Sequence, residues 1–211
     1  MRRWLLVVSV ALLGLAPILL ARPASAGPQI ELTVLGGGMF GGDFQTEEVD
    51  GQFGNTWNVS GMLGLRPSED DHQVFFVSYQ YQLSDLELDF ETRPDLTVPL
   101  HIGRVHACIE ADGRLKKRIH PFLGLSLGAT HYTPDFEDTK TTWFFSTALY
   151  GGVKVPLASW VGLRLQGGMV ATVIGEDAGI VCLSNTGTCI TAENALGVIQ
   201  AEAAGGLYFR F

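Results

Sequence analysis

The sequence predicts an all-β protein: an eight-stranded antiparallel up-and-down transmembrane β-barrel, preceded by a cleaved signal peptide. Hydrophobicity alternates with a period of two through most of residues 27–211, which is the pattern of strands with two different faces. One face is apolar and almost free of charge, whereas the other mixes glycine, small polar residues and isolated ions. The connections between strands alternate between short and long, as they do in transmembrane barrels.

The first 26 residues have the layout of a secretory signal peptide. Met1-Arg2-Arg3 is a basic start, residues 4–20 are apolar, and Ala24-Ser25-Ala26 supplies the small residues that a signal peptidase accepts. We therefore expect a signal peptide over residues 1–26 and one barrel domain over residues 27–211. An uncleaved anchor is the alternative, and Pro17 within the apolar stretch disfavours it. No later segment reaches the roughly 18 uninterrupted apolar residues of a membrane helix, so a mature chain that stays in the membrane must cross it as strands.

Eight stretches carry the alternation. In chain order, their apolar faces run over residues 30–36, 57–65, 75–81, 105–109, 123–129, 143–153, 161–169 and 199–211. The fourth stretch is the weakest, because Leu100 and Ile102 fall on its polar face. A bulge near Gly103, or a shifted register, would explain this departure.

The apolar face is predicted to meet lipid. A soluble lipocalin-like barrel would carry its charges outside, but on a lipid face a charge costs about 2–4 kcal/mol near the midplane, whereas ions inside a narrow lumen can pair. We expect a paired network that bridges the lumen and blocks free diffusion; the alternative is that lumenal water solvates each ion separately. The expected members are Glu31, Arg66, Arg104, Arg164, Glu202 and Arg210. Glu110 and Lys154 lie on the same polar face but are not among the expected members.

The loops divide into two sets. Residues 67–72, 112–120 and 156–159 are expected to form short periplasmic turns, and residues 41–56, 84–97, 133–142 and 174–194 to form longer external loops. Aromatic residues gather near both expected lipid boundaries, which is typical of interfacial girdles. They are Trp57, Tyr79, Tyr81 and Trp143 at one rim, and Trp160, Tyr208, Phe209 and Phe211 at the other.

The chain ends in Gly205-Gly206-Leu207-Tyr208-Phe209-Arg210-Phe211. This ending resembles the C-terminal signal of bacterial outer-membrane barrels, and residues 151–155 with 161–165 resemble the last hairpins of small OmpX-like and opacity-like barrels of the porin family. The resemblance implies a Gram-negative outer-membrane location, and an assembly signal at Leu207, Phe209 and Phe211 that the barrel-assembly machinery reads. It also implies contact with outer-membrane lipid and lipopolysaccharide, and a monomer. Such a fold does not determine an activity.

The cysteines suggest one disulfide. Cys182 and Cys189 share the last long loop of an exported chain, so we predict that they pair. A metal site is the alternative, but no histidine lies nearby in the sequence. Cys108 is predicted to be a buried lumenal thiol without a chemical role.

Four carboxylates, Asp85, Glu87, Asp89 and Glu91, alternate with apolar residues and therefore share one face. Oxygen clusters of this kind suit Ca²⁺ or Mg²⁺, which makes divalent cations a candidate partner. The simpler interpretation is a solvated acidic rim, because charge runs are usually solvated and the EF-hand pattern is absent.

The expected function is non-enzymatic. Lipid A deacylases on similar barrels have a closely spaced histidine and serine. No histidine of this chain has a serine two positions on, whether His72, His101, His106, His120 or His131. No catalytic or cofactor motif is present. The net charge of −8 also argues against nucleic acid as a partner. We expect an envelope-structural or surface-interaction role with acidic external loops. A narrow channel for small solutes and a lipid A-modifying enzyme are the alternatives.

Overall fold

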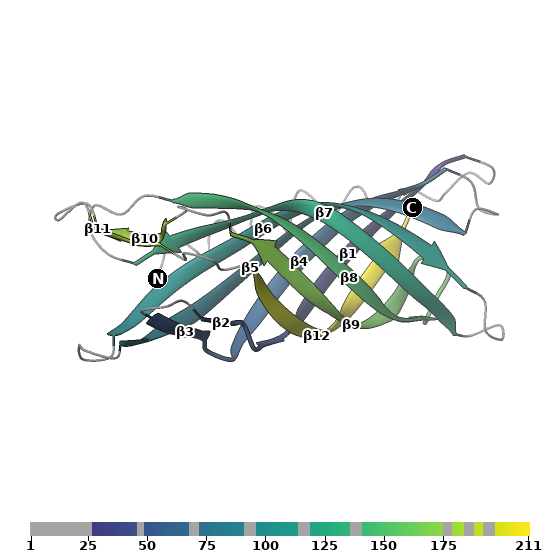
Figure 1. The fold of residues 1–211 in the computed structure, drawn as a ribbon. Coiled ribbons are helices and arrows are strands. Elements are labelled where there is room, and N and C mark those ends of the chain that lie inside the picture. Colours follow the sequence, from purple (N-terminus) through teal and green to yellow (C-terminus); the bar gives the residue numbers. More distant parts are fainter. Residues whose placement is uncertain are drawn as a thin grey trace, which may run out of the picture.

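The computed structural model describes residues 27–45, 49–67, 72–90, 96–113, 119–135, 141–174, 179–183, 188–191 and 197–211, so the predicted signal peptide lies outside the described residues. Eight long antiparallel strands form one barrel (Figure 1). They are β1 (Gln29–Phe40), β4 (Thr56–Arg66), β5 (Gln73–Phe90), β6 (Leu96–Asp112), β7 (His120–Pro134), β8 (Thr142–Pro156), β9 (Val161–Val173) and β12 (Val198–Arg210). No helix in this part of the chain is long and apolar enough to span a bilayer.

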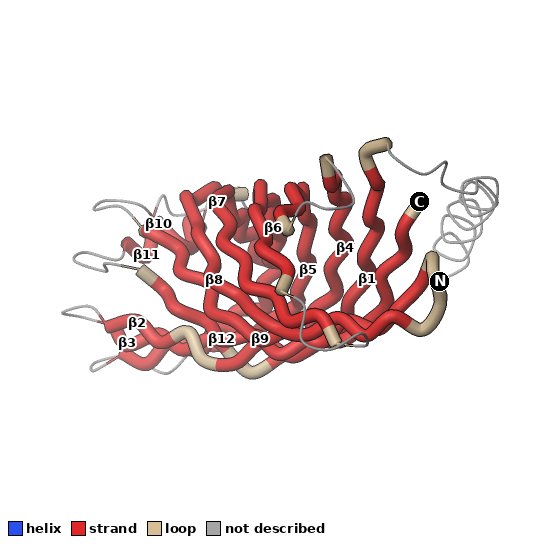
Figure 2. Tube along the Cα trace, turned by 90° about the vertical axis from the view of Figure 1, so that its right-hand side faces the viewer, coloured by secondary structure: helices blue, strands red, loops and turns tan. Residues whose placement is uncertain are grey.

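The barrel closes between its first and last strands. β1 pairs with β12 over ten residues, from Glu31 opposite Arg210 to Phe40 opposite Ala201, and Ile30 and Phe211 exchange backbone hydrogen bonds beyond them. Each of the remaining barrel strands pairs with the barrel strands that precede and follow it in the chain. Figure 2 shows the strands side by side around the barrel. The predicted eight-stranded up-and-down topology is therefore confirmed.

The outer wall of the barrel is apolar. Large hydrophobic side chains remain exposed along every barrel strand, for example Val34, Leu63, Val77, Leu125 and Leu149. The side chains between them point inward, where most are buried. A wall of this kind is stable in lipid and not in water, because an exposed apolar band this continuous would otherwise aggregate.

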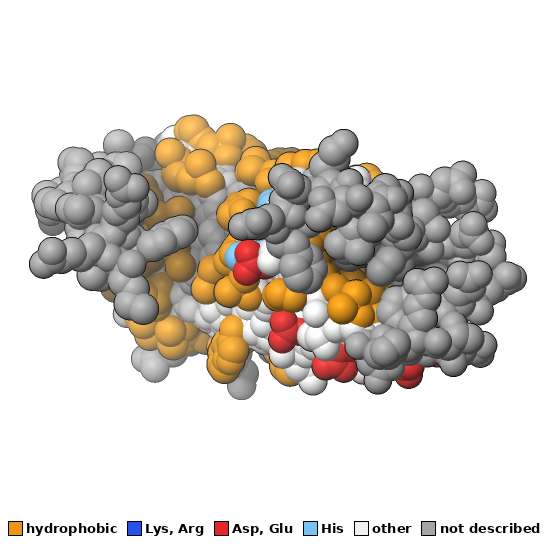
Figure 3. All heavy atoms as spheres, turned by 90° about the vertical axis from the view of Figure 1, so that its left-hand side faces the viewer, with side chains coloured by type: hydrophobic (Ala, Val, Ile, Leu, Met, Phe, Trp, Pro, Cys, Tyr) orange, Lys and Arg blue, Asp and Glu red, His pale blue; other side chains and the backbone are white. Residues whose placement is uncertain are grey.

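The two ends of the barrel differ. At one end, here called the turn end, the strands are joined by the connections after Arg66, Asp112 and Pro156. At the other, the loop end, two short strands extend the sheet: β3 (Val49–Phe53) pairs with β5, and β2 (Asp43–Gln45) pairs with β3. The loop end also carries a separate two-stranded ribbon of β10 (Gly179–Leu183) and β11 (Thr188–Thr191). Figure 3 looks onto this end and shows acidic and histidine side chains there.

Part of the predicted external loops is strand instead. β5 and β6 stay paired from Gln73 opposite Ala111 to Leu88 opposite Leu96, well into the segment 84–97 that the sequence predicts to be a loop. The alternation continues there, since Leu86 and Leu88 are buried while Asp85, Glu87 and Asp89 are exposed. The backbone ladder thus continues to pair amide and carbonyl groups beyond the barrel wall.

The predicted irregularity in the fourth strand is wrong. β6 pairs with β5 and with β7 in unbroken register through Gly103, so it contains no bulge there. Leu100 and Ile102 point inward because the lumen at the loop end is apolar, not because the register shifts. Gly103 instead leaves room for the ring of His131 from the neighbouring strand, which a Cβ at this position would meet.

Candidate functional site

The lumen holds the most unusual chemistry of the molecule, beginning with charged side chains at the turn end. Lys154 on β8 is fully buried and pairs with three carboxylates. Its Nζ lies 2.9 Å from Glu31 Oε1 and 3.3 Å from Asp112 Oδ1, and it also pairs with Glu110. One ammonium group therefore joins strands β1, β6 and β8.

Three arginines complete this turn-end network. Arg164 Nη2 lies 2.7 Å from Glu110 Oε2, Arg210 Nε lies 3.0 Å from Glu31 Oε2, and Arg66 pairs with Asp112. Each carboxylate thus contacts Lys154 and at least one guanidinium. Because buried ions are stable only when they are paired and hydrogen-bonded, the network acts as one unit.

Aromatic rings lie against the cations of the turn-end network. The Arg164 Cζ atom lies 4.1 Å from the centroid of the Phe122 ring, and Lys154 Nζ lies 5.4 Å from that of Phe76. Such contacts attract each cation to the face of the ring. Glu110, Lys154 and Arg164 have no exposed side-chain surface, so water does not reach them.

The network differs in membership from the expected one. The structure brings Glu31, Arg66, Arg164 and Arg210 together, and it leaves Arg104 and Glu202 outside. Three members were missed: Glu110, Asp112 and Lys154. The alternation predicts that Glu110 and Lys154 face inward, but it does not predict that the two side chains lie at the same level along the barrel axis. Asp112 had been assigned to a turn.

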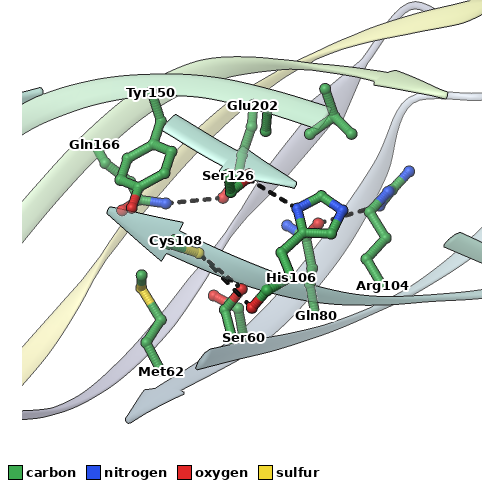
Figure 4. Close-up of a pocket in the computed structure, with 13 residues that line it drawn as sticks. Ser60, Met62, Gln80, Arg104, His106, Cys108, Ser126, Tyr150, Gln166 and Glu202 are labelled. Carbon is green, nitrogen blue, oxygen red and sulfur yellow. Dashed lines mark hydrogen bonds between the residues drawn. The ribbon is translucent and has the colours of Figure 1, made fainter. Parts of the chain in front are cut away.

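The middle of the lumen is polar and partly hollow. A cavity of about 50 Å³ lies here, lined on several strands by serine, glutamine and histidine side chains together with Arg104, Cys108, Tyr150 and Glu202 (Figure 4). His106 contacts the Ser126 hydroxyl through Nδ1 at 2.9 Å and the Ser146 hydroxyl through Nε2 at 2.8 Å.

The loop end of the lumen is closed by an apolar cluster, which we call the loop-end plug. Its side chains come from β3, β5, β6, β7, β8 and β12 and from the residue that follows β9, and they are almost fully buried. They are Phe53, Leu86, Leu88, Val98, Leu100, Ile102, Tyr132, Phe144, Ile174 and Val198. The lumen therefore has an ionic network at the turn end and an apolar cluster at the loop end, with a layer of mixed polar and apolar side chains between them.

The predicted assembly residues lie at the closure of the barrel. Leu207 points outward and is exposed, and Phe209 stacks on Trp160 with ring centroids 6.1 Å apart. Phe211 is held by its backbone hydrogen bonds to Ile30. Tyr208, which the sequence predicts to lie in an aromatic girdle, instead points into the lumen beside Arg210. The reason is that Tyr208 alternates on β12 with the outward-facing Leu207 and Phe209.

The predicted cation ligands do not converge. Asp85, Glu87 and Asp89 follow one another on the outer face of β5, and Glu91 lies outside the described residues. Alternate residues on a strand are about 7 Å apart, too far for one ion to bind three in a row. Within the described ranges, no group of three or more His, Cys, Asp or Glu side chains could hold a metal ion.

The predicted cysteine pair is brought into register by the β10–β11 ribbon, where Cys182 lies directly opposite Cys189. Opposed residues of antiparallel strands have Cα atoms about 4.5–5.5 Å apart, within the range that disulfides span. The disulfide remains a prediction. Cys108 is a buried free thiol in the lumen, hydrogen-bonded to Ser78 at 3.4 Å.

Thiol counting tests this pair. We expect protein denatured without reductant to alkylate only at Cys108, and reduced protein to alkylate at all three cysteines, measured by intact mass. A variant with Cys182→Ser and Cys189→Ser should give the same mass increase with and without reductant. Three modified thiols in the unreduced native sequence would exclude the disulfide.

A second histidine lies outside the barrel near the loop end. The Tyr81 hydroxyl contacts His101 Nδ1 at 2.5 Å, and His101 Nε2 lies 4.0 Å from Asp135 Oδ1. No serine among the described residues hydrogen-bonds to His101. The histidine that does contact serines, His106, lies inside the lumen, where acyl chains of the membrane do not reach.

Comparisons with known proteins bear on the fold. No protein-family model matches the chain, and no curated protein matches it. Among solved structures, Neisserial surface protein A (NspA) matches with a TM-score of 0.57 and 13% sequence identity, over 90% of this chain and 100% of that one. OprG of Pseudomonas aeruginosa matches with a TM-score of 0.55 and 8% identity, over 89% and 98%. The chain therefore has the fold of the small eight-stranded β-barrels of the bacterial outer membrane.

Proposed function

We propose that this protein is a non-conducting, non-enzymatic outer-membrane barrel that presents an acidic sheet at the cell surface, in an envelope-structural or surface-interaction role. The observation that carries the proposal is the presence of buried side chains at both ends of the lumen. The turn-end network and the loop-end plug consist of buried side chains, which we expect to leave no open path for polar or apolar solutes.

The extended β5–β6 hairpin supports the surface role. Its outward face exposes Asp85, Glu87 and Asp89, whereas its inward face is tied to the barrel through the loop-end plug. A rigid acidic ribbon at this height would lie at the level of lipopolysaccharide phosphates. Divalent cations shared between one carboxylate and one phosphate are a partner of suitable chemistry, since Ca²⁺ and Mg²⁺ prefer oxygen ligands. Lipopolysaccharide and the barrel-assembly machinery are the other proposed partners.

The enzymatic alternative has little support in the described residues. A hydrolase needs a nucleophile, a base and an orienting group within reach of its substrate. The His106–Ser126 contact lacks a carboxylate and faces the lumen, and the Tyr81–His101–Asp135 row lacks a serine partner.

Electrical recording tests the proposal against its main rival, a narrow channel. Refolded protein in planar bilayers should give no steady conductance above the lipid background, while a general porin inserted under the same conditions conducts. Insertion is verified separately by heat-modifiable migration of the same sample. Steady unitary steps from the verified barrel would replace the proposed role with that of a channel.

A further inference from the structure

The mid-lumen cavity contains a buried positive charge that lacks an anionic partner. Arg104 on β6 is only 2% exposed, and neutral amide oxygens hold its guanidinium. Nη1 donates to Gln80 Oε1 at 3.1 Å and to Gln82 Oε1 at 2.7 Å, and Nη2 donates to Gln200 Oε1. No carboxylate among the described residues forms an ion pair with it. A buried charge without a counter-charge is costly, so an added anion would stabilise the barrel.

Donor groups around Arg104 also lack partners. Arg104 Nε, Gln82 Nε2 and Asn58 Nδ2 are buried and have no hydrogen-bond acceptor among the described residues, and the buried acceptor Asn58 Oδ1 has no donor there either. Asn58 lies directly opposite Gln82 in the β4–β5 ladder, and Gln82 in turn contacts Arg104, so these donors occupy one layer of the lumen. A cationic N–H and two amide N–H groups in one buried layer are the chemistry of an anion site.

The remaining lining residues limit the charge of the anion. Glu202 is the one carboxylate among the residues that line the cavity, and its Oε1 accepts a hydrogen bond from Gln166 Nε2 at 3.3 Å. Figure 4 shows Glu202 turned toward Gln166 and not toward Arg104. A second negative charge in this layer would be repelled by Glu202, which favours a monovalent ion over sulfate or phosphate. The adjoining cavity of about 50 Å³, which Arg104 lines and Gln82 and Asn58 do not, has room for a halide and not for an organic acid of several carbons.

We propose that the layer around Arg104 binds one small monovalent inorganic anion, of the size of chloride, inside the lumen. The anion neutralises the guanidinium and accepts hydrogen bonds from the N–H groups that protein acceptors leave unused. It enters while the barrel folds or opens, because the turn-end network and the loop-end plug lie on either side of it. The site is a structural counter-ion site and does not require conduction.

Bromide provides the direct test. Protein refolded and crystallised in sodium bromide should show an anomalous peak within hydrogen-bonding distance of Arg104 Nε. Bromide on the surface alone would mean an adventitious ion only, and would overturn the proposal. Water density in its place at the Arg104 layer would overturn it as well.

Heat stability tests the same site in solution. The midpoint is the temperature at which half of the protein has lost the gel migration of the folded barrel. It should be about 5 °C higher in sodium chloride or bromide than in sodium gluconate at equal ionic strength, because a halide that binds the folded state alone stabilises that state. Arg104→Gln should abolish this difference between salts. Arg66→Gln, a matched loss of a lumenal arginine that already has its carboxylate, Asp112, should lower the midpoint in both salts and retain the difference.

Glu202→Gln separates this proposal from the possibility that Glu202 alone balances Arg104. Removing the nearby carboxylate should enlarge the halide effect, since the repulsion is lost. If Glu202 were the counter-ion, the wild-type midpoint would be the same in all three salts, and the proposal would be wrong. If Arg104→Gln does not fold, the bromide peak and the wild-type salt series still decide the outcome.

Discussion

Replacing Glu110 with glutamine should lower the free energy of unfolding of the barrel by about 3–5 kcal/mol. Glutamine has the same shape, so the change removes charge and leaves packing intact. Glu110 is fully buried and contacts both Lys154 and Arg164, which are themselves fully buried. Without it, four cations of the turn-end network share two carboxylates. Urea titration of the lipid-reconstituted barrel, followed by tryptophan fluorescence, measures the loss.

A comparison within the same network sharpens this prediction. Lys154→Met also removes a buried charge, yet it leaves each carboxylate with its own arginine: Glu31 with Arg210, Glu110 with Arg164, and Asp112 with Arg66. It should therefore destabilise the barrel less than Glu110→Gln does. The double variant should be more stable than Glu110→Gln alone, because the excess positive charge is reduced.

Glu87→Gln is the control for removing a carboxylate. Glu87 is exposed on the outer face of β5 in the extended hairpin, so its replacement should change stability by no more than about 0.5 kcal/mol. Equal losses in Glu87→Gln and Glu110→Gln would show that the turn-end network does not determine stability.

Alternation was sufficient to predict the barrel because a lipid-facing strand allows no ambiguity about its two faces. Every second side chain from Val161 to Met169 had to be apolar, and the structure exposes Leu163, Leu165 and Met169. The same rule was misapplied at Leu100 and Ile102. It assumed a polar lumen along its whole length, whereas at the loop end the inward side chains are apolar and contact one another.

The pairing of lumenal ions could not be predicted from faces alone. Which ions meet depends on the stagger between strands, which sets the height of each side chain along the barrel axis. In the structure, the β1–β12 register places Glu31 opposite Arg210. The sequence gives no sign that Lys154, on a distant strand, also reaches the Glu31 carboxylate.

Glycine at the closing seam leads to the second large effect. Gly206 on β12 faces the lumen, and a Cβ there would run into the Val34 carbonyl oxygen and the Leu35 Cα atom of β1. Both obstacles are backbone, so a rotamer change cannot relieve the contact. Gly206→Ala should therefore push β1 away from β12 and destabilise the barrel by about 1–3 kcal/mol, as overpacking does in other interiors.

The matched control for Gly206→Ala is Gly61→Ala on β4. A Cβ at Gly61 would meet no atom within 4 Å, because this residue faces outward. The added methyl group would lie in lipid, and alanine also restricts the unfolded chain more than glycine does, so Gly61→Ala should be neutral or slightly stabilising.

Urea titration of both variants gives the comparison, and heat-modifiable migration reports whether the barrel of each variant has closed. Because the pairing of β1 with β12 closes the barrel, we expect Gly206→Ala also to leave a larger unclosed fraction after refolding. An equal folded fraction and equal stability for the two variants would mean that the seam can widen at no cost, contrary to the tight approach of β1 and β12 at this point.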